Sequence, residues 1–303
     1  MKMIIGIDAG GTKTKGLLLD DNKNILQEAI SGHGNPTVSF PDALKNIGNV
    51  IQHLTMDQAS SSIDSIIIGM AGAESGNLAP EMKKELEKLT SLPIYIINDA
   101  ALAYFSLIGN NNGVLTISGT GSISYGRNGA LEGMTGGWGH LLGDEGSAYH
   151  VAIQSIKRIA DEIDQGVPLS YLSSNLLKKI SATDGKGLKG FIYSSSKGEI
   201  ASLTEVIHQL AEGGNQTAIS LFQDAGTALG HQTVQLLQRL NIVDTPIVAW
   251  KGSVLEKNQW VQEAFKKVID AAFNGASYRS HSLSPATGAI EVQYAIKKGM
   301  IQG

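Results

Sequence analysis

Two short glycine-rich segments and one isolated carboxylate carry most of the chemistry that this sequence offers. The first segment follows a run of apolar residues and reads Asp8-Ala9-Gly10-Gly11-Thr12-Lys13-Thr14. It combines an acid, hydroxyls and a lysine with glycines, which let backbone N–H groups approach phosphate oxygens closely. An ordinary turn would not need this combination of glycines with a threonine and a lysine. We therefore predict a phosphate-binding turn, with Asp8 placed to hold a magnesium ion through water.

The second segment, Ser118-Gly119-Thr120-Gly121-Ser122, also follows an apolar run that is typical of a strand. It lies 108 positions after the first, so that Gly11-Thr12-Lys13-Thr14 corresponds to Gly119-Thr120-Gly121-Ser122. The match is a weak internal repeat, short enough to arise by chance. Both copies nevertheless place N–H groups and hydroxyls at the tip of a hairpin.

The isolated carboxylate is Asp99, in the sequence Ile97-Asn98-Asp99-Ala100-Ala101. It stands where a buried strand is expected to turn into a helix, at the edge of the sheet where α/β folds bind ligands. Asp99 is a candidate general base that accepts a hydroxyl proton during attack on phosphorus. The alternative is that Asn98 or Asp99 only caps the helix. The local sequence leaves both interpretations open.

A third glycine-rich stretch, from Gly136 to Ala148, contains Trp138 and the acidic pair Asp144-Glu145 ahead of a helix. Sugars are bound by carboxylates that accept from their hydroxyls and by backbone groups that only glycine lets come close. This predicts a sugar-binding loop. The alternatives are that the two acids only interact with the helix dipole and that Trp138 is a core residue.

Three other motifs have a structural alternative. Asn35 is a turn residue or a polar contact to substrate, and Lys251-Gly252-Ser253 is a plain turn or borders a nucleotide base. The Gly-x-Gly-x-x-Gly pattern at Gly185–Gly190 does not follow a strand, so it lacks the context of a dinucleotide site. We predict a flexible loop there.

Composition limits the class of protein. The chain has 303 residues, 42% hydrophobic and 17% charged, which suggests about two folded domains. It has no cysteine, so disulfides, thiolate nucleophiles and cysteine-bound clusters are excluded. A net charge of −4 disfavours nucleic acid as a partner. The first residues do not resemble a signal peptide and no long apolar run occurs, so we expect a cytoplasmic protein with no membrane association.

Strands and helices alternate over the first part of the chain, which predicts an α/β fold. After Glu145 the sequence becomes largely helical. The expected strands cover residues 3–7, 16–19, 25–30, 63–70, 93–98, 114–118, 123–125, 246–250 and 278–283. The expected helices cover residues 41–58, 79–90, 100–107 and 258–273, with a closing helix from residue 285.

Taken together, the motifs resemble the actin, hexokinase and Hsp70 ATPase superfamily, and within it the N-acetylglucosamine kinase branch, which is grouped with the BadF-type ATPases. The resemblance spans nearly the whole chain. Its residues are Gly10-Gly11-Thr12-Lys13, Asn98-Asp99-Ala100, Ser118-Gly119-Thr120-Gly121-Ser122 and the long, specific stretch from Gly136 to Tyr149.

The resemblance implies an α/β protein of two ribonuclease H-like lobes with a central nucleotide/sugar cleft. The N-terminal lobe would comprise residues 1–112 and 285–303, and the C-terminal lobe residues 113–284. ATP and Mg²⁺ would be the cofactors, and Asp99 would fall on the catalytic base. Sugar-contacting positions would be Asn35, Gly137, Trp138, Gly139 and Asp144. Nucleotide-binding positions would be Gly10, Gly11, Thr12, Lys13, Thr120, Gly121, Ser122, Gly252 and Ser253.

The expected activity is ATP-dependent phosphorylation of the 6-hydroxyl of N-acetylglucosamine. N-acetylmuramic acid and glucosamine are alternative substrates, and a sugar sensor or a partner-driving ATPase are alternative functions. Relatives that bind an iron–sulfur cluster or carry a cysteine-rich zinc motif do not fit, because the chain has no cysteine. The resemblance also implies a homodimer.

Overall fold

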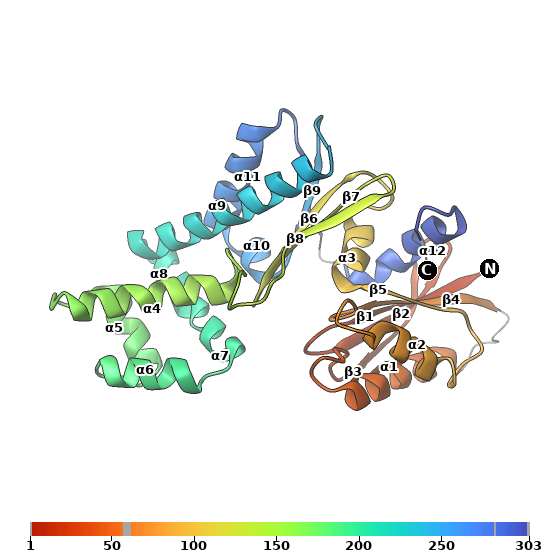
Figure 1. The fold of residues 1–303 in the computed structure, drawn as a ribbon, viewed down its shortest axis with the longest axis horizontal. Helices are drawn as coiled ribbons and strands as arrows, with labels where there is room; N and C mark the ends of the chain where they lie inside the picture. Colours follow the sequence, from red (N-terminus) through yellow and green to blue (C-terminus); the bar gives the residue numbers. More distant parts are fainter. Residues whose placement is uncertain (1, 57–61, 282, 302–303) are drawn as a thin grey trace. The chain divides into compact units, whose positions relative to one another are not determined.

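The chain forms two compact units. The computed structural model describes residues 2–56, 62–281 and 283–301, and Figure 1 shows its helices and strands. The first unit comprises residues 1–115, 125–132 and 279–303, and the second unit comprises residues 116–124 and 133–278. The resemblance implies an N-terminal lobe of residues 1–112 and 285–303 and a C-terminal lobe of residues 113–284. In the structure the first unit also includes residues 125–132, and the chain re-enters this unit at residue 279.

The first unit is built on a five-stranded sheet with the order β3-β2-β1-β4-β5. β1 pairs antiparallel with β2 and parallel with β4, and β5 pairs parallel with β4. The central strands are rich in isoleucine and leucine and are almost fully buried, as expected for strands covered on both faces. The bounds are β1 Met3–Ala9, β2 Thr14–Asp20, β3 Ile25–Ser31, β4 Ile63–Met70 and β5 Ile94–Asn98.

Helices cover both faces of this sheet (Figure 1). On one face α1 packs its buried residues against alternate residues of β1, and α2 completes the same apolar cluster. On the other face Gly6 lies against Ala289 of α12, and Gly69 lies against Leu102 of α3. Both glycines let a helix approach the sheet closely. The bounds are α1 Phe40–Thr55, α2 Leu78–Leu86, α3 Asp99–Leu107, η2 Pro285–Gly288 and α12 Ala289–Lys297.

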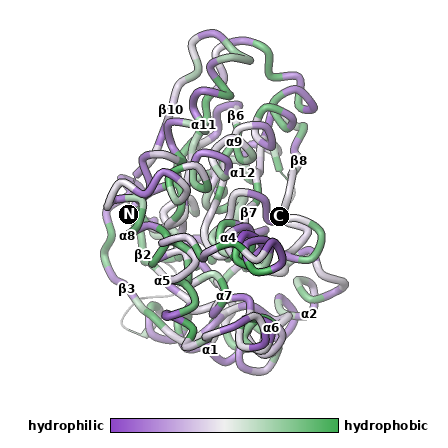
Figure 2. Tube along the Cα trace, turned by 90° about the vertical axis from the view of Figure 1, so that its left-hand side faces the viewer, coloured by the Kyte–Doolittle hydropathy of each residue, from purple (hydrophilic) through white to green (hydrophobic). Residues whose placement is uncertain are grey.

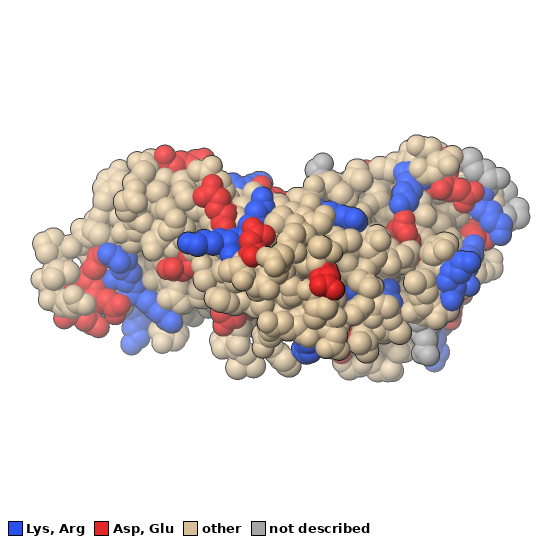
Figure 3. Space-filling view, turned by 90° about the horizontal axis from the view of Figure 1, so that it is seen from above, with Lys and Arg blue, Asp and Glu red and all other residues tan. Residues whose placement is uncertain are grey.

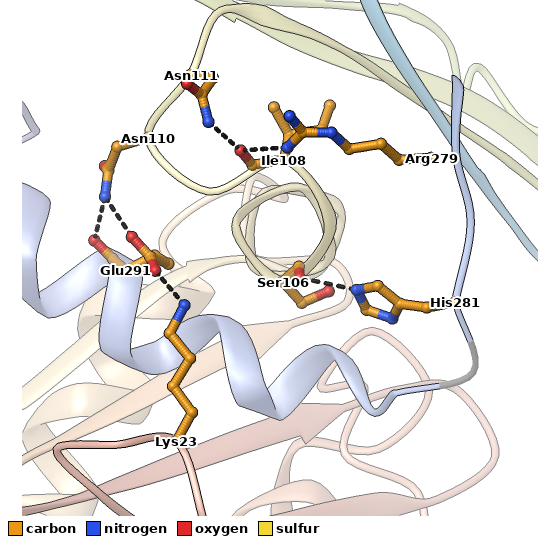
Figure 4. A network of polar contacts seen from close by, with 8 residues as sticks. All are labelled: Lys23, Ser106, Ile108, Asn110, Asn111, Arg279, His281 and Glu291. Atoms are coloured by element: carbon orange, nitrogen blue, oxygen red, sulfur yellow. Dashed lines mark hydrogen bonds and ion pairs between the residues drawn. The ribbon is translucent and has the colours of Figure 1, made fainter. Parts of the chain in front are cut away.

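Polar contacts fix the returning segment and α12 in the first unit (Figure 4). Arg279 donates to the carbonyl oxygen of Ile108, and His281 lies 3.0 Å from that of Ser106, so both side chains satisfy carbonyls near the end of α3. Glu291 of α12 pairs with Lys23 and accepts from the Asn110 amide. The C-terminal helix is therefore held by residues from distant parts of the sequence.

The second sheet has the strand order β10-β9-β6-β7-β8. Read from the other end, this is the order of the first sheet, with β6 in the place of β1. The two segments related by the weak sequence repeat, Gly11–Thr14 and Gly119–Ser122, therefore join equivalent strands, β1 to β2 and β6 to β7. The bounds are β6 Gly113–Ser118, β7 Ser122–Asn128, β8 Leu131–Gly136, β9 Ile247–Lys251 and β10 Ser277–Arg279.

The second unit carries most of the helices. The long helices α9 and α11 lie side by side, because Gly226 and Gly230 of α9 contact Val261 and Val268 of α11 directly. Helix α4 is amphipathic, because its buried residues, Val151, Ile156 and Ile159 among them, share one face; in Figure 2 its coil carries both green hydrophobic and purple hydrophilic residues. The bounds are α4 Ala148–Asp164, α5 Tyr171–Lys179, α6 Gly185–Ser194, α7 Lys197–Ser202, α8 Thr204–Glu212, α9 Gln216–Arg239, α10 Ser253–Lys257 and α11 Gln259–Ala272.

Two local predictions need correction. The glycine pattern at Gly185–Gly190 is not a flexible loop but the start of α6. Asp184 caps this helix by accepting from the N–H of Gly187 at 2.9 Å, which offsets the poor helix propensity of its glycines. Strand β8 was not expected at all. In addition, residues 57 and 58 of the expected helix 41–58, and residue 282 of the expected strand 278–283, lie outside the described residues.

Lysine and arginine side chains are interspersed with acidic ones on the face drawn in Figure 3, without a continuous basic surface. None of the helices in the described part of the chain is long and apolar enough to cross a membrane.

Candidate active site

The first glycine-rich turn lies between β1 and β2 and contains Gly10 to Lys13. It is closed by a hydrogen bond from the Gly10 N–H to the Lys13 carbonyl oxygen, 3.0 Å, and Gly10 accepts from the Gly34 N–H at 2.8 Å. A Cβ atom added to Gly11 would have nothing within 4 Å. Thr12 and Lys13 are exposed. Gly11 therefore leaves open space beside backbone donors, which is what a phosphate-binding turn requires.

Asn35 lies close to this turn in the first unit. Its Oδ1 accepts from the N–H and the hydroxyl of Thr37 at 2.9 and 2.7 Å, which is the hydrogen bonding of an Asx turn. Gly72, at a φ of +75°, approaches so closely that its Cβ would lie 2.9 Å from the same oxygen. Asn35 therefore has a turn role, and its Oδ1 position is fixed by two neighbouring segments.

Asp99 lies at the same edge of the sheet as the first turn. In the strand register Ala9 is opposite Met70 and Met70 is opposite Asn98, so the ends of β1, β4 and β5 are level. Asp99 is the first residue of α3, directly after β5. Burial raises the pKa of its carboxyl group above the ordinary value, although a hydrogen bond from the Ala100 N–H favours the ionised form. A carboxylate with a raised pKa is a stronger base.

Sequence reasoning missed a second carboxylate in this region, Glu74, on the segment that follows β4. Burial raises its pKa, and the negative charges of Glu132 and Asp99 raise it further. Nothing in the local sequence around Glu74 distinguishes it from a surface glutamate. Because β4 and β5 pair in parallel, the segment after β4, which carries Glu74, and the segment after β5, which carries Asp99, lie at the same edge of the sheet.

In the second unit, the second glycine-rich turn is fixed against the segment that precedes α4. Gly119 accepts from the Ala148 N–H at 2.8 Å, and the Ser118 hydroxyl donates to the Gly146 carbonyl oxygen at 2.8 Å. The Ser122 hydroxyl donates to the carbonyl oxygen of Glu145 at 2.7 Å. These hydrogen bonds fix the turn to the segment before α4. A Cβ atom added to Gly119 would have no atom within 4 Å, so the space beside Gly119 is open.

Asp144 is the most constrained residue of this segment. Its side chain is 3% exposed and forms an ion pair with Lys197 at 2.6 Å. Its other oxygen accepts from the Ser122 N–H at 3.1 Å. Its φ is +66°, a left-handed conformation that costs a residue with a side chain about 1 kcal/mol. Asp144 therefore connects the third glycine-rich stretch to the second turn, and Lys197 is a further residue that sequence reasoning did not find.

The rest of the third stretch is an exposed loop. Trp138 is 75% exposed, so it is not a core residue. Gly137 and Gly139, on either side of it, have φ values of +73° and +81°, which favour glycine. Gly137 donates to the Ser122 carbonyl oxygen at 3.0 Å. The loop that carries Trp138 therefore starts at the second turn.

Gly252 and Ser253 also adjoin the second turn. Gly252 has a φ of +95°, and a Cβ there would overlap the carbonyl group of Ser118. A cavity of about 350 Å³ lies beside them, and Thr120 and Ser253 both contribute to its lining. Most of its other lining residues were not predicted from the sequence, among them His208, Phe222 and Asn258. His208 lies in α8, Phe222 in α9 and Asn258 between α10 and α11, so no local motif could indicate that they meet.

The predicted site residues thus form two groups. The first unit brings together Asp8, Gly10, Gly11, Thr12, Lys13, Asn35 and Asp99. The second unit brings together Thr120, Gly121, Ser122, Gly137, Trp138, Gly139, Asp144, Gly252 and Ser253. In the described residues, no group of three histidine, aspartate or glutamate side chains is arranged to hold a metal ion.

Two five-stranded sheets with the same strand order, each with a glycine-rich turn between its first two strands, define the class of two-lobe ATPases and sugar kinases. The family model described as the BadF/BadG/BcrA/BcrD ATPase family matches residues 5–292. The chain belongs to this family. The family and the α/β fold class expected from the sequence are therefore confirmed.

The chain aligns with individual relatives over almost the whole length of both proteins. The chain is 30% identical to the N-acetylmuramic acid/N-acetylglucosamine kinase of Clostridium acetobutylicum, covering 96% of this chain and 97% of that protein. It is 27% identical to the N-acetyl-D-glucosamine kinase of Dictyostelium discoideum, covering 98% and 99%. The solved structure of the ROK hexokinase from Thermus thermophilus matches with a TM-score of 0.64 at 15% identity, covering 98% of this chain and 100% of that chain.

Proposed function

We propose that this protein is an ATP-dependent kinase that phosphorylates the 6-hydroxyl of N-acetylglucosamine. The names of the Clostridium and Dictyostelium relatives support the substrate class. The first of them also names N-acetylmuramic acid, which has a lactyl ether on its third oxygen, as a second sugar to test.

The observation that carries the proposal is the position of Asp99. It follows a parallel strand, at the same edge of the sheet as the first glycine-rich turn, and burial raises its pKa. In the proposed reaction Asp99 accepts the proton of the 6-hydroxyl as the oxygen attacks the transferring phosphoryl group. Asn98, rather than Asp99, is the cap of α3, so the carboxylate is not needed for that role.

The remaining predicted residues would bind the two substrates. The N–H groups and hydroxyls of the two turns, Gly10–Lys13 and Thr120–Ser122, would bind phosphate oxygens. Gly252 and Ser253 would border the nucleoside, for which the neighbouring cavity of about 350 Å³ offers room. The loop Gly137–Gly139, with Asn35 and Asp144, would bind the sugar.

The donor set fits a magnesium ion held mainly by water and phosphate oxygens. Asp8 is the next-to-last residue of β1, just before the first turn, and Mg²⁺ commonly keeps several waters with one or two carboxylates. The described residues offer no group of three acidic or histidine ligands, which agrees with an ion that the nucleotide helps to hold. When bound, the ion would offset negative charge on the phosphates.

The test is a coupled assay of ADP formation with ATP, MgCl₂ and a panel of N-acetylglucosamine, N-acetylmuramic acid, glucosamine and glucose. We expect ADP formation that depends on N-acetylglucosamine, and NMR of the product should place the phosphate on the sixth oxygen. ATP hydrolysis that no sugar changes would instead support the partner-driving ATPase. Sugar binding without phosphoryl transfer would support the sensor. We also propose that the protein is a homodimer and that it is located in the cytoplasm. Light scattering of the purified protein tests the first statement, and cell fractionation tests the second.

A further inference from the structure

Lys197, the first residue of α7, lies in the second unit beside the predicted phosphate-binding turn. Its ammonium group is 2.6 Å from Asp144 Oδ2, and Asp144 Oδ1 accepts from the backbone N–H of Ser122 in that turn. One carboxylate thus connects the lysine to the turn. The two residues are 53 positions apart in the sequence.

The ammonium group also lies directly against the turn. A Cβ atom added to Gly121 would be 2.9 Å from Lys197 Nζ and 2.9 Å from Asp144 Oδ1. The absence of a side chain at Gly121 therefore makes room for this ion pair. An anion bound by the N–H groups of the turn would lie within a few ångströms of a positive charge.

The simplest role for Lys197 is to neutralise the buried charge of Asp144. The exposure of the two side chains argues for more, because Asp144 is 3% exposed whereas Lys197 is 31% exposed. An ammonium group has three N–H donors, and Asp144 accepts from one of them. The next residue, Gly198, lines the same cavity as Thr120 and Ser253, so this end of α7 reaches the proposed nucleotide site.

We propose that Lys197 is a nucleotide-binding residue that donates to a phosphate oxygen beyond the α-phosphate, and that Asp144 positions its ammonium group against the second turn. The inference rests on the proposed nucleotide site but not on the identity of the sugar. Asp144 keeps its proposed contact to the sugar, because carboxylate oxygens accept several hydrogen bonds.

The first test compares ADP with adenosine, which lacks the phosphates. Calorimetry in MgCl₂ should show that Lys197→Met weakens ADP binding about tenfold to a hundredfold, the usual effect of losing a charged hydrogen bond. Adenosine binding, followed by NMR, should change by less than about twofold. Lys197→Arg should restore most of the ADP affinity, because it keeps the charge. Lys189→Met, at an exposed position of α6, is the matched control and should bind ADP like the wild type.

The second test separates a phosphate contact from the effect of an unpaired Asp144. In Lys197→Met the buried carboxylate loses its counter-charge, which could weaken ADP binding by repulsion alone. The double variant Lys197→Met/Asp144→Asn removes that charge. We expect it to regain thermal stability while ADP affinity stays low.

Restored ADP affinity in the double variant would overturn the proposal, as would equal losses of ADP and adenosine binding in Lys197→Met. The outcome is independent of the sugar. A wild-type protein that binds ADP but phosphorylates no sugar would contradict the proposed kinase function and leave the role of Lys197 to be decided by the ADP measurements.

Discussion

Asn98 and Asp99 both accept from the same donor: the Ala100 N–H lies 2.8 Å from Asn98 Oδ1 and 2.9 Å from Asp99 Oδ1. Asn98 has the extended backbone of an N-cap, whereas Asp99 is already part of α3. Of the two interpretations left open by the sequence, the structure shows the capping role, whereas the role of Asp99 as a base stays a prediction. Asn98 caps the helix, and Asp99 has a carboxylate oxygen left for chemistry.

The first prediction follows from this division. Asp99→Asn keeps the shape and the hydrogen bond to Ala100 but removes the base. We expect sugar binding to persist while turnover falls about a hundredfold or more, measured by the coupled ADP assay and by calorimetry with the sugar. Asp161→Asn, at an exposed position of α4, is the control. Normal turnover in Asp99→Asn would rule out the assigned base.

The second prediction concerns stability and pH. Burial raises the pKa of Asp99 in the folded protein, so the folded state binds this proton more tightly than the unfolded chain. Stability should therefore decrease as pH rises from the ordinary value of about 4 through the raised pKa. Above that range Asp99→Asn should be more stable than the wild type, and the difference should vanish at low pH.

Urea unfolding of both proteins across a pH series measures this difference. Because Glu74 carries a charge close to Asp99, the same series on Glu74→Gln is needed as a control. A difference between Asp99→Asn and the wild type that does not change with pH would mean that the effect is one of packing.

The third prediction concerns the open space at Gly11. An added methyl group would touch nothing in the protein, so Gly11→Ala should fold with a melting temperature close to that of the wild type. If a phosphate occupies this space, the KM for ATP should rise about tenfold, because the methyl group blocks the approach to the backbone. Gly190→Ala, also in open space but on α6, should leave the KM unchanged. Equal kinetics of the two variants would argue against a phosphate at the first turn.

The fourth prediction separates two costs at Gly252. Its φ of +95° and the overlap of a Cβ with Ser118 both penalise a side chain. Gly214 has a similar φ of +83° but open space around it. Gly214→Ala should cost about 1 kcal/mol of unfolding free energy from the backbone alone, and Gly252→Ala at least about 2 kcal/mol more. If urea titrations gave the same loss of unfolding free energy for both variants, the turn at Gly252 would be able to shift and accommodate a methyl group.

The fifth prediction concerns Trp138. Because this side chain is 75% exposed, Trp138→Ala should leave the melting temperature almost unchanged. The KM for N-acetylglucosamine should rise about tenfold if the ring packs on the sugar. Tyr193→Ala, at a position that is 82% exposed, is the control for loss of an exposed aromatic side chain. An unchanged KM would remove Trp138 from the sugar site.

The predictable parts of the fold are those with a local physical signal. The strand over 63–70 was predicted with its observed bounds, because the segment is short and centred on the β-branched run Ile66-Ile67-Ile68, which is typical of a buried parallel strand. Strand β8, Leu131–Gly136, was missed because it is only partly buried and contains glycine and glutamate without an alternating pattern. Helix α6 was missed because its glycines outweighed the capping signal of Asp184.

The same distinction applies to the candidate site. Glycine turns, Asp99 and the stretch around Trp138 are each visible within a few residues of sequence. Lys197 cannot be recognised in this way, because what distinguishes it is a contact with Asp144, which is 53 positions away in the sequence. His208 and Phe222 are likewise ordinary helical residues until the fold places them around one cavity.

The shared strand order of the two sheets has a consequence for how such a protein can diversify. Between its third and fourth strands, the described part of the first sheet's connection contains the helix Phe40–Thr55, whereas the second sheet carries there the helices from Ala148 to Arg239. The same strand order thus accommodates connections of very different length. The helices at this connection of the second sheet provide Lys197 and part of the cavity wall without any change in the order of the strands.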